Sequence, residues 1–174
     1  EKTYRLYVQL SNGGFLTQMF ADETRPHSIV TTTQFLNANI PFLGQEYNLQ
    51  YQVPASAFGS GMFPNGEYDT WATLGDSYDD NTDPGVVGDV GFGANLSGSS
   101  WTFGGTPNSD AAIYRVGTDT LCFADANGRV LIGQFTTDGD LSGVINISGL
   151  YLNGASWEAT QVAFSTSVIY GCTD

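Results

Sequence analysis

The chain has 174 residues, and its 18 Asp and Glu outnumber five Lys and Arg, for a formal net charge of −13. So few basic residues cannot form the cationic surface that nucleic acid or an anionic membrane requires, and no apolar run reaches the roughly 20 residues of a membrane helix. Hydrophobic residues make up 41% of the chain, which is enough to build a core and excludes a disordered polymer.

Alternating apolar and polar residues between Gly- and Asn-rich turns predict strands along most of the chain. We expect these strands at 3–10, 15–21, 28–35, 47–53, 68–75, 120–124, 129–137, 141–150 and 157–170. The pattern of the last strand is mixed, which indicates partial cover on both faces. No helix is expected. Many short strands predict an all-β fold, an antiparallel β-sandwich of jelly-roll type, with residues 1–174 as a single domain.

The Gly- and Asp-rich stretch 76–105 is expected to be a long loop, and its acidic start predicts a calcium site. The candidate ligands are Asp76, Asp79, Asp80, Asn81, Asp83 and Asp89. Calcium takes six to eight oxygen ligands, which an acidic loop can supply. The spacing is not that of an EF-hand, and a solvated acidic loop is the alternative. The acids near 119–127 and 136–140 are explained by turn chemistry.

Aromatic residues in or near the loops suggest carbohydrate binding. Trp71, Tyr78 and Trp101 are the candidates, because sugar rings stack on exposed aromatic faces. The alternative is that Trp71 and Trp101 are core residues. A hydrolase with paired carboxylates, drawn from Glu67, Asp69 and Glu158, is a further alternative.

Cys122 and Cys172 are the only cysteines. In a secreted protein we expect them to form a disulfide, whose closed loop of about 50 residues would stabilise the fold. The alternatives are two unrelated thiols, or pairing of Cys172 with a cysteine outside this sequence.

Three other features carry little functional signal. His27 is the only histidine, and its place after Arg25-Pro26 predicts an ordinary surface residue. The sequons at Asn95 and Asn146 matter only in a eukaryotic secretory pathway, and Asn146 lies within an expected strand. The run 31–33 is a single Thr triplet, which is weak support for ice binding.

Several segments resemble a β-rich module of very large secreted proteins from marine, Bacteroidetes-like bacteria. The end of the chain, Gly171-Cys172-Thr173-Asp174, resembles the opening of the short Cys-rich repeat that follows such modules. The other similar segments are 3–7, 31–35, 68–75, 128–139 and 142–146. The resemblance implies an extracellular or cell-surface module of a longer protein, and it carries no established activity.

The sequence therefore predicts a non-catalytic extracellular module for adhesion, matrix building or carbohydrate binding, stabilised by calcium. Its expected partner is a carbohydrate or a cell-surface or matrix component. The first residues are not those of a signal peptide, so the signal of a secreted chain would lie outside this sequence. The alternatives are the hydrolase and a structural subunit that assembles by sharing strands at 3–10 or 157–170.

Overall fold

The computed structural model describes residues 1–10, 14–37, 39–40, 45–46, 68–75, 84–90 and 98–167. Its strands are β1 (Lys2–Gln9), β2 (Phe15–Ala21), β3 (His27–Thr31), β4 (Asn39–Ile40), β5 (Gln45–Glu46), β6 (Trp71–Ala72), β7 (Gly85–Val87), β8 (Ser100–Phe103), β9 (Ala111–Tyr114), β10 (Arg129–Thr137), β11 (Leu141–Leu150) and β12 (Ser156–Ser165). A 3-10 turn, η3, spans Thr120–Cys122. No helix in these residues is long and apolar enough to cross a membrane.

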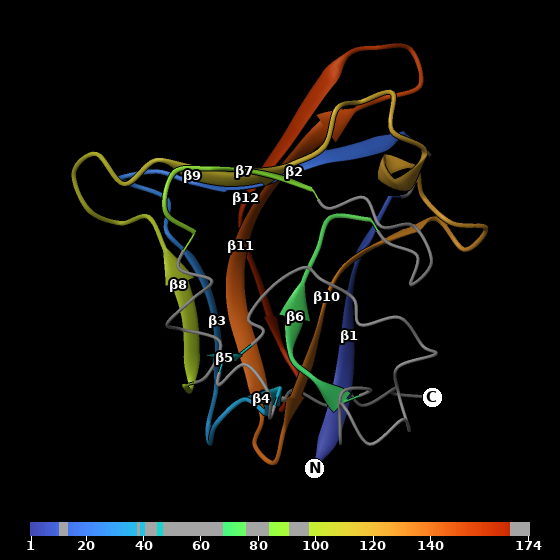
Figure 1. Ribbon diagram of the computed structural model, residues 1–174. Coiled ribbons are helices and arrows are strands. Elements are labelled where there is room, and N and C mark those ends of the chain that lie inside the picture. Colours follow the sequence, from blue (N-terminus) through green and yellow to red (C-terminus); the bar gives the residue numbers. More distant parts are fainter. Residues whose placement is uncertain are drawn as a thin grey trace, which may run out of the picture.

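The strands form an antiparallel β-sandwich, which confirms the predicted fold class (Figure 1). The short sheet has the order β1-β10-β6. The curled sheet has the order β7-β9-β2-β11-β3-β8, with β12 also paired to β11. β4 and β5 form a separate pair. The jelly-roll connectivity stays a prediction.

The curled sheet bends because β2 and β3 share β11 as their partner. Met19 in β2 pairs with Ile147, whereas Ser28 in β3 pairs with Val144. Between these two registers the chain leaves the sheet at residues 22–26 and returns. As a result, β2, β9 and β7 cross one end of the molecule, while β3, β8 and β11 run along its length (Figure 1).

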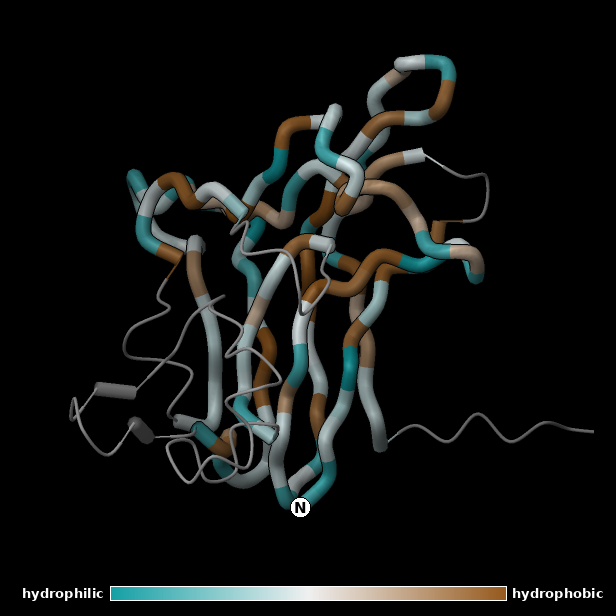
Figure 2. The backbone as a smooth tube through the Cα atoms, turned by 45° about the vertical axis from the view of Figure 1, so that its right-hand side comes forward, coloured by the Kyte–Doolittle hydropathy of each residue, from teal (hydrophilic) through white to brown (hydrophobic). Residues whose placement is uncertain are grey.

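The core lies between the two sheets. Its largest fully buried side chains include Trp101 from β8 and Phe135 from β10, whose rings stack with centroids 6.2 Å apart. Ile29 from β3 is also fully buried. Hydrophobic stretches follow many of the strands, whereas many turns are hydrophilic (Figure 2). Burial of these apolar side chains is the main stabilising contribution to such a fold.

Threonine hydroxyls join the two sheets at one end of the sandwich. Thr31 of β3 and Thr137 of β10 lie 2.6 Å apart at their Oγ1 atoms, and Thr33 is 2.8 Å from the same Thr137 oxygen. Buried hydroxyls need such partners because an unpaired polar group in the core is destabilising. The Thr triplet therefore has a structural role in this fold.

Some expected strands differ from the observed ones. The expected strand 68–75 is reduced to β6, and 47–53 lies outside the described residues. The strand expected at 120–124 is wrong, because Asp119 accepts the Leu121 amide at 2.9 Å and caps the turn η3. β7 and β8 fall within the expected loop 76–105, and β9 was not anticipated from the sequence.

Candidate binding groove

An open groove runs along one side of the sandwich, between the outermost strands of the two sheets. β1 is at the edge of the short sheet, and β12 is at the edge of the curled sheet. The groove encloses about 390 Å³. This edge groove is lined by Leu6, Tyr7, Val8, Gln9, Leu10, Ile145, Ile147, Tyr151, Trp157, Ala159, Val162 and Phe164.

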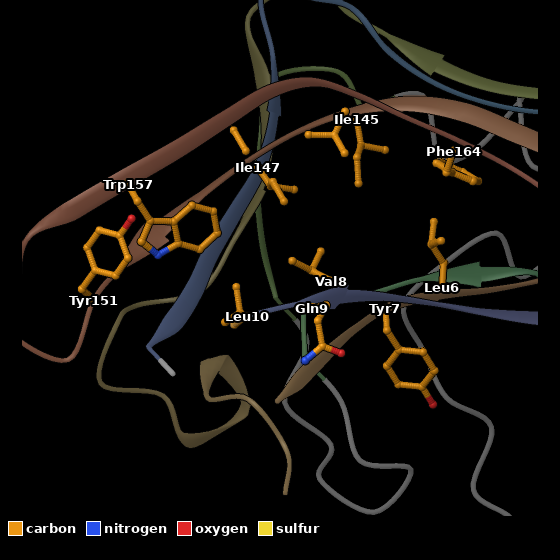
Figure 3. Close-up of a pocket in the computed structure, with 12 residues that line it drawn as sticks. Leu6, Tyr7, Val8, Gln9, Leu10, Ile145, Ile147, Tyr151, Trp157 and Phe164 are labelled. Atoms are coloured by element: carbon orange, nitrogen blue, oxygen red, sulfur yellow. The ribbon is translucent and has the colours of Figure 1, made fainter. Parts of the chain in front are cut away.

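β1 supplies one wall of the edge groove through alternate side chains. Leu6, Val8 and Leu10 point toward β11 and β12, whereas Tyr7 and Gln9 point away (Figure 3). The outward residues hold this part of β1 in place. The Tyr7 ring packs against the Arg129 guanidinium at 4.6 Å, and Gln9 Nε2 donates to the Asn127 and Gly128 carbonyls at 3.1 Å.

β11 and β12 supply the opposite wall, and their burial differs. Ile145 and Ile147 of β11 are each only 5% exposed. On β12, Trp157 and Phe164 are partly buried, and Val162 is 39% exposed. β11 pairs with described strands along both of its edges, whereas β12 pairs only with β11 among the described strands.

The aromatic rings of β12 lie over glycines of β11. Trp157 pairs with Gly149, and Phe164 pairs with Gly143. A Cβ atom on Gly149 would meet the Trp157 ring at 2.6 Å, and one on Gly143 would meet the Phe164 ring at 2.7 Å. The missing Cβ atoms let the rings lie flat across the sheet, as an aromatic residue often does opposite a strand glycine. The two rings therefore mark the ends of the edge groove (Figure 3).

Asn146 anchors β12 where the curled sheet bends. Its Nδ2 donates to the carbonyls of Phe20, Arg25 and Pro26 at 3.0–3.2 Å. Its Oδ1 accepts the backbone amide of Gln161 at 2.9 Å and the Gln161 side chain at 3.0 Å. Asn146 is fully buried, so its sequon is closed to modification in the folded protein.

Gln161 creates a bulge in β12 opposite Asn146. Its φ angle is 54°, which is uncommon for a residue other than glycine. The register between β11 and β12 shifts at this point, between Ile145 and Ile147. The extra residue bends β12 and re-aims the side chains that follow it, including Val162.

An ion-pair network fixes the outer face of β12. The Arg25 guanidinium contacts Glu158 of β12 at 2.6 Å and also pairs with Asp22. Arg25 lowers the pKa of Asp22 well below its usual range, mainly through their side-chain hydrogen bond. The network ties the 22–26 segment to β12 and leaves the groove-facing side of the strand apolar.

No ionisable side chain other than tyrosine is among the described residues that line the edge groove. This is unusual in a chain with 18 acidic residues. A charged ligand would lose hydration there without gaining an opposite charge. The groove therefore suits an uncharged, largely apolar occupant.

Most of the predicted calcium ligands lie outside the described residues. These are Asp76, Asp79, Asp80, Asn81 and Asp83. Asp89 is described and exposed. Within the described ranges, no group of three or more His, Cys, Asp or Glu could hold a metal. The calcium site stays a prediction.

The predicted sugar-binding aromatics do not lie at the edge groove. Trp101 is fully buried and donates from Nε1 to the Val90 carbonyl at 2.8 Å. Trp71 of β6 is 4% exposed. Both are core residues, which is the alternative that the sequence left open, and neither offers a free face for stacking. Tyr78 lies outside the described residues.

Cys122 is buried and has no cysteine partner among the described residues. Its Sγ contacts the Val116 carbonyl at 3.5 Å, and burial, with a smaller effect of Asp119, raises its pKa to about 11. Cys172 lies outside the described residues, so the disulfide stays a prediction.

His27 is not the surface residue that its sequence context predicts. It is fully buried, with its ring stacked on Phe103 at 4.4 Å and edge-on to Trp101 at 4.8 Å. Neither ring nitrogen has a hydrogen-bond partner among the residues that the structure describes. Burial lowers its pKa to about 3, so it is neutral near pH 7 and cannot reach a substrate in solvent.

The carboxylates considered for hydrolysis are not brought together in the described structure. Asp69 is buried just before β6, on the short sheet, whereas Glu158 lies on β12 of the curled sheet and pairs with Arg25. Glu67 lies outside the described residues.

The edge groove was missed by sequence reasoning. Its one signal was the mixed pattern of the last strand, where Trp157, Ala159, Val162 and Phe164 follow no single alternation. In comparisons with known proteins, no family model, curated protein or solved structure matches the chain.

Proposed function

We propose that the chain is a non-catalytic extracellular module of the adhesion or matrix-building kind, which binds its partner in the edge groove. The observation that carries the proposal is the uncharged lining of this groove in a strongly acidic chain. A volume of about 390 Å³ is within the range of ligand sites, which are mostly apolar with a few polar groups. The acidic composition and the resemblance of the sequence support the extracellular setting.

Carbohydrate capture is the second candidate function. It is favoured by the Tyr151 and Trp157 rings, which lie next to each other at one end of the groove (Figure 3). Tyr151 is 42% exposed, so a sugar ring could reach its face. These two residues replace Trp71 and Trp101 as the candidates for stacking.

Binding at the groove can be tested with two variants of adjacent residues. Val162 lines the groove, whereas Ala163 is exposed and does not. We expect Val162→Lys to abolish binding to a surface array of polysaccharides and matrix proteins, and Ala163→Lys to preserve it. Equal binding by the two variants would place the ligand elsewhere and refute the proposal.

Calcium would stabilise the module through the acidic stretch 76–83. Ligands that bind only the folded state add about 2.7 kcal/mol at a hundredfold excess over Kd. Thermal unfolding with calcium and then with a chelator, at fixed ionic strength, measures this effect. An unchanged midpoint of thermal unfolding would contradict a stabilising calcium site.

A further inference from the structure

On the side of the edge groove, β1 is the last described strand of the short sheet and β12 is the last described strand of the curled sheet. β1 pairs only with β10 among the described strands, so its second edge has no described partner. β12 pairs only with β11 among the described strands, and its groove-facing Trp157 and Phe164 are only partly buried. One additional strand beside β1 would complete the sandwich and cover β12.

The spacing of the groove side chains matches an extended chain. Leu6, Val8 and Leu10 face the groove from alternate positions of β1 (Figure 3). An extended chain repeats its side chains on one face about every 6.7 Å, so a strand beside β1 would keep this repeat. Ala159 is the small residue between Trp157 and Phe164 on β12, and it leaves room for an incoming side chain.

The edge of β1 along the groove is free of charge. Lys2 and Arg5 both precede Leu6, and residues 6–10 carry no ionisable group except the Tyr7 hydroxyl. On β12 the one charged residue is Glu158, whose carboxylate pairs with Arg25. Natural edge strands usually carry charges that prevent pairing, and this stretch has none.

We propose that the edge groove accepts an extended segment of another polypeptide, which pairs with the edge of β1 that has no described partner and lays uncharged, apolar side chains on β12. Main-chain hydrogen bonds to β1 would give affinity, and alternate side chains in the groove would give specificity. This inference deepens the proposed function and rests on it. A second copy of this chain is less suited, because two copies of charge −13 repel each other.

The test uses ten-residue, end-capped peptides that alternate Val, Leu or Phe with Thr and Ser. Isothermal titration measures their affinity for the whole chain. The matched control peptide has the same sequence with an N-methyl group on every residue, which removes the backbone donors along both edges and keeps every side chain. Because each lost hydrogen bond weakens binding, we expect the methylated peptide to bind at least about tenfold more weakly.

The variants of the adjacent residues locate the bound peptide. Val162→Lys places a charge in the groove, and Ala163→Lys places it on exposed surface. We expect a loss of at least about tenfold for Val162→Lys and no loss for Ala163→Lys. Circular dichroism and the thermal midpoint establish that both variants fold.

Each other outcome overturns the inference. Equal affinity for the methylated peptide would show that no strand pairing occurs, and equal affinity of the two variants would place the peptide elsewhere. If glycans bind in a Val162-dependent way and no peptide does, the proposed function stands and the strand partner is wrong. If neither binds, both proposals fail. Self-association of the chain alone, lost in Val162→Lys, would identify a second copy as the occupant.

Discussion

Similar aromatic side chains are fully buried in the closed interior and only partly buried at the edge groove. In the interior, Trp101 and Phe135 lie between the two sheets and are fully buried. At the edge groove, Trp157 and Phe164 stay partly exposed, because β12 is the outermost described strand on this side of the curled sheet. Apolar side chains therefore form core where the two sheets overlap, and a potential binding surface where one sheet extends beyond the other.

Truncation of Trp101 should give the largest loss of stability. Trp101→Ala removes a fully buried ring and its hydrogen bond to Val90, so we expect a loss of about 3–5 kcal/mol in the free energy of unfolding. Chemical denaturation measures it. A loss below about 1 kcal/mol would show that this side of the sandwich is not closed.

Acid should weaken the closed interior through His27. Its pKa falls from 6.5 to about 3 on burial, so folding favours the neutral form. The contribution of neutral His27 to stability is fully present above pH 6.5 and is lost as the pH drops toward 3, which amounts to about 3 kcal/mol by pH 4.5. Chemical denaturation across this range measures the slope.

The control for this slope is His27→Phe, which keeps a ring between Trp101 and Phe103 and removes the titration. Its stability should change little between pH 6.5 and 4.5. Carboxylates with lowered pKa, such as Asp22 and Asp125, lose their contribution only at lower pH. Equal slopes in the two proteins would contradict the burial of His27.

Asn146 joins β12, at the edge groove, to the closed interior of the sandwich. Its substitution should therefore weaken the attachment of β12. Asn146→Ala leaves the carbonyls of Phe20, Arg25 and Pro26 without this donor, and we expect a loss of about 2 kcal/mol. Chemical denaturation measures it. Gln161→Ala is the milder control, because its backbone amide can still donate to Asn146. Similar losses for both would contradict the anchoring role of Asn146.

Truncation at the edge groove should have the smallest effect on stability. Trp157→Ala removes a partly exposed ring, so we expect a loss of about 1 kcal/mol, well below that for Trp101→Ala. The same denaturation experiment gives both values. If Trp157→Ala is as costly as Trp101→Ala, then β12 is covered and the groove is part of the core.

The sequence predicted the strands best where the local pattern decides the structure. The expected ranges 15–21, 129–137 and 141–150 coincide with β2, β10 and β11, because regular alternation and strong turns define them. The strand expected at 120–124 is wrong, because the Asp119 side chain captures a local amide and starts a 3-10 turn instead. That competition between side chain and backbone is decided by local geometry.

The candidate site was less predictable for a different reason. Whether His27 or Trp157 is covered depends on which strands lie opposite, and no local pattern states how many strands each sheet contains. His27 follows a turn signal at Pro26, yet it begins β3 and enters the core. The groove depends on the short sheet ending at β1, which is a property of the assembled sheets.

The most direct test of the open edge is amide hydrogen exchange resolved by residue. In β11, which pairs with β12 on one edge and with β2 and β3 on the other, we expect most amides to be protected. In β1 and β12, amides that pair with β10 or β11 should be protected, while alternate amides that face the groove exchange fast. Uniform protection along β1 and β12 would show that this edge is already covered, and would contradict the account.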